Sequence, residues 1–479
     1  MAMKGRAGTV LALLTTSALL AAGCSGGGDE APAEEELYKN PVTLTWWHNA
    51  SQDGPGKTYW EKVAKDFSAL HPTVTIQIEA IETNQLQRTR LPAALLTTDP
   101  PDIFQAWGGG EMREQVEADY LKDITEQVKA EVANIGSAAE IWAVEGKQYG
   151  LPYRMGIEGI WYNKDMFDRA GIAAVPTTFD ELNDAVTKLK AINVVPIALG
   201  AGDKWPAAHW WYNFALRACS VDTLKKASTE AVFDDPCFVK AGEDLKTFIG
   251  TNPFQPNFIA TPGQNDPTSA NGMLANGKAA MELMGDWNKG TLETVAEDKA
   301  ALAKFLGWFP VPAISGSAGD PKAALGGGDG FACAKNAPAE CVEFLKYIVS
   351  PEVQKGYAET GTGLPVAKGA ESGVADPALK SILEATSGAT YVQLWLDTAF
   401  GSTVGNAMND AIVAIFAGSG SPQQVVDAMK APARTCPPPT NPSPPRGRRR
   451  PRRRASGPPG GGRPPAWPKN AVSGTRSSG

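Results

Sequence analysis

Two hydrophobic patterns divide the start of the chain into strands and helices. Residues 42–46 and 74–78 alternate apolar and polar side chains, as strands do, and apolar side chains over 60–67 recur at helical spacing. Strand, helix and strand in this order predict a βαβ unit. A second helix is predicted over 84–96, irregular around Pro92 because proline interrupts the helical hydrogen bonds. The chain therefore begins as an α/β protein.

The same patterns predict elements along the rest of the chain. A short strand is predicted within 99–107, a buried strand over 194–199, and helices over 178–191, 239–249, 340–349 and 405–416. Thr177 or Thr178 is the expected cap of the helix over 178–191, because a threonine hydroxyl accepts from the first free backbone N–H groups. Pro351 is expected to stop the helix over 340–349.

The first 24 residues have the pattern of an export signal. Two basic residues, Lys4 and Arg6, precede an apolar run over 10–20, which small residues and Cys24 follow. The run is too short to span a bilayer comfortably. A cysteine after small residues resembles a lipobox, although Ala21 stands where leucine is usual. We expect an exported lipoprotein anchored to the extracytoplasmic face of the cell membrane; the alternative is simple cleavage with a free thiol.

Composition sets both ends apart from the body. Residues 25–40, which begin rich in glycine and acidic residues, are expected to form a flexible tether, so the body begins near Pro41. From Ala431 to Gly479 the chain has 11 Lys and Arg, 13 Pro and no Asp or Glu. Without this tail the formal charge changes from −7 to −18, because 34 basic residues (45 minus 11) then stand against 52 acidic ones. Its composition favours a disordered, frameshifted sequence; a cationic arm for anionic polymers is the alternative.

Six cysteines suit an exported protein. Cys24 is assigned to lipid and Cys436 lies in the tail, and the spacing of the other four favours two local disulfides, Cys219–Cys237 and Cys333–Cys341. The alternative pairings require distant segments to meet. A metal site is not expected, because the cysteines form no CxxC and have no histidine beside them.

Eight short strings along residues 41–430 carry a resemblance to one family. They are Leu44–Trp47 (LTWW), Pro101–Phe104 (PDIF), Gly146–Tyr153 (GKQYGLPY), Trp161–Gly171 (WYNKDMFDRAG), Pro176–Leu182 (PTTFDEL), Gly277–Met281 (GKAAM), Gly285–Trp287 (GDW) and Gly326–Phe331 (GGGDGF). No single string is diagnostic. Their order and spacing resemble the family 1 extracellular solute-binding proteins of bacterial carbohydrate ABC importers.

The resemblance implies an α/β fold of the periplasmic-binding-protein type, with two lobes, a multi-strand hinge and a ligand cleft between the lobes. It places residues 41–151 and about 305–347 in the first lobe, and 152–304 and about 348–430 in the second. It also implies a monomeric receptor without a cofactor, which delivers a sugar to ABC permease subunits in the membrane. Nucleic acid is not an expected partner.

The candidate binding residues follow from the chemistry of sugars. A pyranose has an apolar C–H face, on which aromatic rings stack, and a rim of hydroxyls, which polar side chains bind. The chain has 13 Trp, several beside polar residues. From these and from the family strings we expect a site made of Trp46, His48, Asp102, Trp107, Arg154, Trp205, Trp211, Asp286, Trp287, Asp329, Trp395 and Asp397. The alternatives are core positions for the tryptophans, and capping or solvated positions for the polar residues.

Two other tryptophans are expected in the core. Trp60 lies on the apolar face of a predicted helix, and Trp308 lies within an apolar strand.

Catalysis is not expected. The chain has three histidines and no HExxH, GxSxG or CxxC motif. A secreted glycoside hydrolase is the competing class, and it would need two carboxylates facing each other across the cleft, for which Asp286 and Asp329 are candidates. A third class is an adhesive surface protein that uses the basic tail. The many aromatic residues favour an oligosaccharide ligand, and residues 46–48 with 108–111 resemble receptors for xylo-oligosaccharides such as xylobiose.

Overall fold

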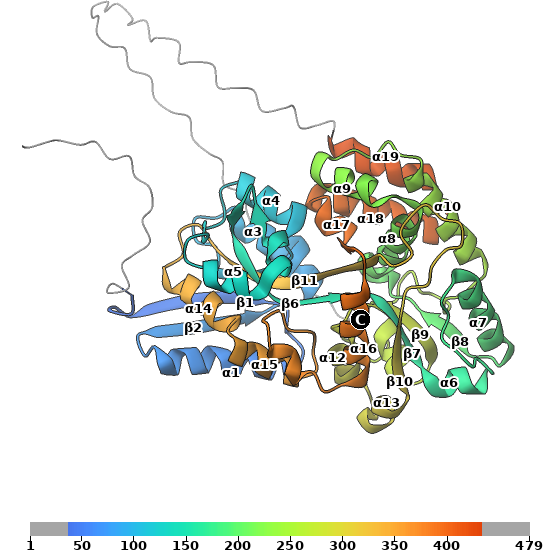
Figure 1. Ribbon diagram of the computed structural model, residues 1–479, viewed down its shortest axis with the longest axis horizontal. Coiled ribbons are helices and arrows are strands. Elements are labelled where there is room, and N and C mark those ends of the chain that lie inside the picture. Colours follow the sequence, from blue (N-terminus) through green and yellow to red (C-terminus); the bar gives the residue numbers. More distant parts are fainter. Residues whose placement is uncertain (1–36, 434–479) are drawn as a thin grey trace, which may run out of the picture. The chain divides into compact units, whose positions relative to one another are not determined.

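The computed structural model describes residues 37–433 (Figure 1). The predicted signal, the lipidated Cys24, the tether up to residue 36 and the tail from residue 434 lie outside the described residues. Residues 37–40, expected in the tether, pack on the body: Tyr38 stacks on His71 with ring centroids 4.0 Å apart. The backbone N–H of Tyr38 also donates to Glu340 at 3.4 Å. The ordered body therefore begins before Pro41.

A six-stranded sheet forms the centre of one of the two parts of the fold, and we call this part the first lobe. Its order is β12-β11-β3-β1-β2, and β6 also pairs with β11. β1, β2 and β3 run parallel, which confirms the predicted βαβ unit, while β11 runs antiparallel to β3 and β6. The strands are β1 (Val42–His48), β2 (Val74–Ala80), β3 (Ile103–Ala106), β6 (Gly150–Ile157), β11 (Ala324–Cys333) and β12 (Val392–Leu394).

Helices and one hairpin complete the first lobe (Figure 1). The hairpin joins β4 (Ala143–Val144) and β5 (Lys147–Gln148). The helices are α1 (Pro55–Leu70), α2 (Thr83–Gln85), α3 (Leu91–Leu95), α4 (Gly109–Glu117), α5 (Lys129–Ile135), α14 (Glu340–Ile348) and α15 (Pro351–Glu359), with 3-10 turns at Gly136–Trp142 and Ala370–Gly373. The core of this lobe contains Trp46, Trp60, Phe331 and Phe344, whose rings meet edge to face around Trp46.

A four-stranded sheet of order β10-β7-β9-β8 forms the second lobe. β7 (Gly159–Asn163) is antiparallel to β9 (Ala279–Met284) and to β10 (Leu306–Pro310), and β8 (Val195–Ala198) is parallel to β9. Around it lie α6 (Lys164–Arg169), α7 (Phe179–Ala191), α8 (Trp205–Ala218), α9 (Val221–Glu230), α10 (Cys237–Gly250), α11 (Ala270–Ala275), α12 (Asn288–Val295), α13 (Lys299–Phe305), α16 (Pro377–Gly388), α17 (Leu396–Ala399), α18 (Ser402–Phe416) and α19 (Pro422–Ala433), with a 3-10 turn at Ala201–Asp203.

Local signals explain several helix ends. Thr178 caps α7 in a capping box, in which its side chain accepts from the N–H of Glu181 and the Glu181 side chain binds back. The predicted helix over 84–96 is interrupted by a π-helix at Leu86–Arg90, and Pro92 lies in the first turn of α3, which follows the π-helix directly. Pro351 ends the preceding helix as expected, but it also starts α15.

The chain crosses between the two sheets at places that differ from the expected lobe boundaries. β6 extends to Ile157 and pairs with β11, so the first crossing lies at Glu158 rather than near 151. β10, expected in the first lobe, pairs with β7 in the second sheet. Tyr357 packs in the first core, and β12 pairs in the first sheet, although both were expected in the second lobe. Strand pairing between distant segments decides these positions, and no local pattern reports it.

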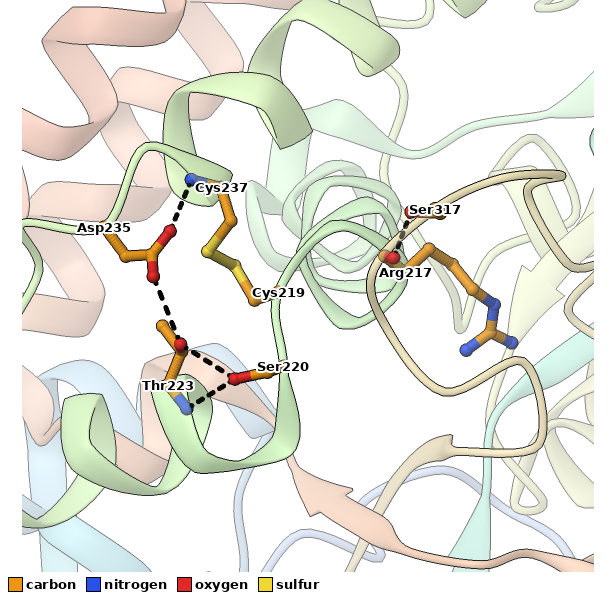
Figure 2. The surroundings of a disulfide bond; sticks show 7 residues. All are labelled: Arg217, Cys219, Ser220, Thr223, Asp235, Cys237 and Ser317. Atoms are coloured by element: carbon orange, nitrogen blue, oxygen red, sulfur yellow. Dashed lines mark hydrogen bonds between the residues drawn. A yellow bond between two sulfur atoms is a disulfide. The ribbon is translucent and has the colours of Figure 1, made fainter.

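Two disulfides fix neighbouring elements, and both predicted pairs are confirmed. Cys219, which follows α8, is bonded to Cys237 at the start of α10, and Cys333 at the end of β11 is bonded to Cys341 in α14. Figure 2 shows the first bond beside Arg217, whose backbone carbonyl accepts from the Ser317 hydroxyl. The buried Arg217 guanidinium donates to three carbonyls of the segment that connects β10 to β11, those of Val311, Pro312 and Ala323.

Across residues 37–433, no helix combines the length and the apolar character needed to cross a bilayer.

Candidate ligand-binding site

A cavity of about 190 Å³ is lined by residues from both lobes. The first lobe contributes the loop after β1, the start of α1 and part of the π-helix. The second contributes the start of α8, the loop after β9 and the segment before α17. Seven of the twelve predicted site residues line this cavity: Trp107, Arg154, Trp205, Trp287, Asp329, Trp395 and Asp397.

Three tryptophans form one aromatic wall. The Trp287 ring lies 5.5 Å from that of Trp395, nearly perpendicular to it, and 6.2 Å from that of Trp205. The Trp287 indole N–H donates to Gln264 at 3.3 Å, which fixes the ring orientation. Trp60, predicted and found in the core with 2% of its surface exposed, also lines the cavity. The cavity wall therefore consists of flat apolar surfaces with hydrogen-bonding groups at their edges.

Arg154 joins two of the predicted carboxylates. Its Nε donates to Asp329 at 2.7 Å and its Nη1 to Asp286 at 2.9 Å, so strands β6 and β11 of one sheet are tied to the loop after β9 of the other. The guanidinium carbon lies 4.8 Å from the centroid of the Trp287 ring, a cation–π distance. A Cβ at Gly156 would lie 2.3 Å from the Asp286 side chain, so glycine is required for this close approach.

Asp286 therefore does not line the cavity. It is fully buried, and its second oxygen accepts the backbone N–H of Leu364 at 3.1 Å. Burial is the largest influence on the Asp286 carboxyl and raises its pKa, while the Arg154 charge opposes this shift. Both carboxylates of the proposed glycosidase pair are thus bound to one guanidinium, with Asp286 outside the cavity wall. The arrangement of an acid and a nucleophile facing each other across a substrate is not formed by this pair.

A second ion pair connects the two lobes beside the cavity. Arg88, on the π-helix, donates to Asp397 at 2.9 Å, and Asn409 of α18 donates to the same oxygen at 3.1 Å. Gln87 donates to the buried Glu111 at 2.8 Å. Burial raises the pKa of the Glu111 carboxyl to about 7. π-helical turns occur often at functional sites, and here the turn directs Gln87 and Arg88 to the cavity.

Four of the predicted site residues lie away from the cavity instead, three of them in the cores. Trp46 and His48 are 0% and 1% exposed, because alternate side chains of β1 face the first core, and burial lowers the pKa of His48 to about 3. Asp102 accepts from the backbone and hydroxyl of Thr45 and so ties β3 to β1. Trp211 is fully buried and stacks on Phe238. Polar neighbours in the sequence were a misleading signal for Trp46 and Trp211, and the family string was the misleading signal for Asp102.

Several cavity residues were missed by the sequence interpretation, including Gln87, Arg88, Tyr153, His209 and Tyr357. One usable signal existed for His209: it follows Trp205 by four positions on one helix, so both side chains lie on one face. No local signal marks Tyr357, because it reaches the cavity through the tertiary packing of α15 against α1.

Comparison with known proteins identifies the class to which this fold and site belong. Residues 49–355 match the family of bacterial extracellular solute-binding proteins, which is more than half of the chain. The chain therefore belongs to this family, whose members bind solutes and are not enzymes. The predicted α/β periplasmic-binding-protein fold is confirmed by the likeness to solved members described next.

Two relatives and one solved structure are similar to this chain over most of its length. An uncharacterised ABC transporter extracellular-binding protein of Pyrococcus horikoshii is 27% identical over 430 residues, covering 84% of this chain and 91% of the relative. The diacetylchitobiose binding protein of Streptomyces coelicolor is 27% identical over 356 residues, covering 72% and 78%. A solved structure from work on xylan utilisation by Caldanaerobius polysaccharolyticus is 26% identical with a TM-score of 0.72, covering 81% of this chain and 99% of that one.

Proposed function

We propose that this protein is the sugar-binding subunit of a bacterial ABC importer, with an oligosaccharide such as a xylo-oligosaccharide as its ligand. The observation that carries the proposal is the wall of Trp205, Trp287 and Trp395 in a cavity whose other walls hold hydrogen-bonding side chains. Aromatic rings match the C–H faces of pyranoses, and the polar side chains match their hydroxyls.

Two of the similar proteins support a β-1,4-linked oligosaccharide. Their names refer to diacetylchitobiose and to xylan, both of which are β-1,4-linked sugars. The flat faces of such chains are accessible, which suits several tryptophans along one cavity. The xylo-oligosaccharide is the finer part of the proposal, and a chito-oligosaccharide is its nearest competitor.

Ligand capture would proceed by closure of the two lobes around the sugar. A ligand shifts an open–closed equilibrium only by its difference in affinity for the two states, so it has to contact both lobes in the closed state. Residues of both lobes line the cavity. The closed monomer would then be recognised by the permease subunits, and the energy for transport would come from their ATPase.

Residues 1–24 support export and anchoring. The signal pattern and Cys24 are consistent with a lipoprotein on the extracytoplasmic face of the membrane, where a receptor of this class meets its permease.

A thermal-shift screen tests the ligand class. Xylo-, chito-, cello- and malto-oligosaccharides are compared, because a ligand at 100 times its dissociation constant adds about 2.7 kcal/mol of stability. The proposal expects stabilisation by one β-linked series. Absence of any shift, with a folded protein at millimolar sugar, would contradict the sugar-binding role. Release of reducing sugar from the same oligosaccharides would instead indicate a hydrolase.

A further inference from the structure

His209 lies in the cavity wall, and a buried carboxylate is hydrogen-bonded to one of its ring nitrogens. The side chain comes from α8, is 4% exposed, and its Nδ1 is hydrogen-bonded to Glu158 Oε1. Glu158 is the single residue between β6 and β7, where the chain crosses from the first sheet to the second. It is 2% exposed, and its own N–H donates to the Leu325 carbonyl at 2.8 Å. The carboxylate is therefore fixed at the crossing.

Neighbouring side chains support the position of the imidazole ring and of its carboxylate partner. Asn213, one helical turn further along, donates to the second Glu158 oxygen at 2.7 Å and to the His209 carbonyl at 3.0 Å. The Trp395 ring is stacked 6.1 Å away, 6° from parallel, and the Trp205 ring lies 5.0 Å away. These contacts define one orientation of the ring.

The other ring nitrogen, Nε2, is the one available to a ligand. Among residues 37–433 only Nδ1 of this ring has a hydrogen-bond partner, the side chain lines the cavity, and Nε2 is not among the enclosed unpartnered atoms, which include Nε2 of His48. A polar atom on a nearly buried ring, directed into a tryptophan-walled cavity, needs a polar group on the ligand.

We infer that His209 contacts the sugar directly, with Nε2 hydrogen-bonded to one ligand hydroxyl between Trp205 and Trp395, and that Glu158 and Asn213 are positioning residues. This rests on the proposed function. With the Glu158 carboxylate accepting a hydrogen bond from the Nδ1–H, Nε2 is an acceptor in the neutral ring and a donor in the imidazolium. A sugar hydroxyl is both donor and acceptor, so it bonds to either form. An ether oxygen can only accept a hydrogen bond, and a methyl group or a deoxy position can do neither, so only a hydroxyl bonds to both forms of the ring. His209 therefore selects a hydroxyl at this position of the ligand.

Nuclear magnetic resonance tests the contact without any substitution in the site. The chain has three histidines, so protein labelled with ¹⁵N-histidine gives three pairs of ring-nitrogen signals, which His48 and His71 variants assign. Xylobiose and diacetylchitobiose are the probes. We expect the Nε2 shift of His209 to move on saturation with the sugar that binds. The signals of His48, enclosed in the first core, and of His71, stacked on Tyr38, should stay in place. An unmoved His209 signal in a saturated protein would overturn the inference.

Affinity measurements by calorimetry add the functional test. His209→Phe keeps a flat ring without Nε2, and we expect at least about tenfold weaker binding, which corresponds to about 1.4 kcal/mol. His209→Gln retains a hydrogen-bonding group near the same position and should bind within about threefold of the wild type. Equal binding by His209→Phe would also overturn the inference. If the wild-type protein binds no sugar, the proposed function fails instead.

The positioning role has its own matched pair. In Glu158→Gln, the side-chain oxygen still accepts a hydrogen bond from the His209 Nδ1–H. The side-chain oxygen of Asn213 has no hydrogen-bond partner among the described residues, so after rotation of its amide it can accept from the new glutamine NH₂. Its affinity should stay near that of the wild type. Glu158→Leu removes the anchor and should weaken binding although His209 is intact. Melting curves without sugar separate this effect from unfolding, and equal affinity of the two variants would remove the role from Glu158.

Discussion

Trp287 connects the aromatic wall to the buried ion pairs. Its ring packs with Trp205 and Trp395, while the Arg154 guanidinium lies 4.8 Å from its centroid. Arg154 is itself held by Asp286 and Asp329. Three of the predicted polar site residues thus serve largely to bind one another, and through Arg154 they set the position of an aromatic ring that faces the cavity.

Replacement of Trp287 by alanine should impair binding more than folding. Loss of a buried aromatic contact costs about 2–4 kcal/mol of binding free energy, or roughly 30- to 1000-fold in affinity. The melting temperature should fall as well, because the partly buried ring packs against two clusters of buried apolar side chains. Calorimetry on the folded Trp287→Ala protein measures the affinity, with Trp308→Phe, a core substitution, as the control that lowers stability alone. Wild-type affinity in Trp287→Ala would remove this residue from the site.

Glu282 makes stability depend on pH. Burial raises the pKa of its carboxyl from 4.5 to about 8, against a smaller opposite effect of the Asn288 hydrogen bond. A carboxyl with a raised folded pKa contributes stability fully below its unfolded pKa and loses that contribution as the pH rises through the folded value. The wild-type protein should therefore lose stability between about pH 5 and 8.

Glu282→Gln should remove this loss. Relative to the wild type, its free energy of unfolding should increase over this pH range, by on the order of 3–5 kcal/mol. Its melting temperature should increase relative to the wild type in the same direction. Glu297→Gln, at an exposed position, should track the wild type at every pH. Parallel melting temperatures of Glu282→Gln and the wild type would show that Glu282 is already ionised in the folded protein.

At the scale of elements, the sequence predicted what local chemistry determines. The βαβ start, the Thr178 cap and the helix over 405–416 follow from periodicity and capping, and the structure has them at nearly the predicted residues. The placement of β12 beside β11 could not be predicted, because a strand of three residues has no usable pattern and its pairing joins segments about 70 positions apart. The same limit applies to the lobe boundaries.

The site was predictable only in part, for a related reason. Residues such as Trp205 and Trp395 could be named because their type suits a sugar, and the structure brings them to one cavity. Whether a tryptophan faces a core or a cavity depends on which neighbours cover it, so Trp46 and Trp211 could not be separated from the others by sequence. Arg88 and His209 needed the tertiary structure to reveal their partners, Asp397 and Glu158.

Each disulfide should stabilise the elements that it joins. The bonds close loops of 18 and 8 residues, for which the chain-entropy relation gives about 3 and about 2.5 kcal/mol, respectively. The double variant Cys219→Ser/Cys237→Ser should unfold at a lower denaturant concentration, because the ends of α8 and α10 are no longer held together. Its free energy of unfolding should be lower by about 3 kcal/mol. Peptide mapping without reduction should find both pairs, and a peptide that links Cys219 or Cys237 to Cys333 or Cys341 would contradict the assignment.

At the scale of the whole molecule, attachment to the membrane would depend on one side chain. Stable anchoring needs more than one acyl chain or a second signal. The lipobox-like sequence offers a single cysteine for modification, so the whole lipid anchor would be attached at Cys24. Cys24→Ser should therefore move the protein from the membrane fraction to the medium, with sugar binding unchanged. The measurement is fractionation followed by immunoblotting, and retention of the variant in the membrane would contradict lipid anchoring at Cys24.

Charge divides the chain into an acidic body and a basic end, and this division makes a prediction about the whole molecule. All 11 basic residues after Ala431 follow Ala433, where α19 ends, so a chain that stops at Ala433 has a formal charge of −18 instead of −7. The cavity residues all lie before this point. We therefore expect the shortened protein to bind oligosaccharide with the affinity of the full chain.

The two proteins should differ in their attraction to anionic polymers. At low salt the full chain should be retained on heparin and released as salt rises, because exposed charges are screened, whereas the shortened, strongly acidic protein should flow through. Calorimetry with the best oligosaccharide from the screen supplies the matching measurement. Retention on heparin together with equal sugar affinity would mean that the basic end is an electrostatic appendage, independent of the receptor. Much weaker sugar binding by the shortened protein would instead show that residues 434–479 take part in ligand capture, and it would contradict the interpretation of the tail as a frameshifted sequence.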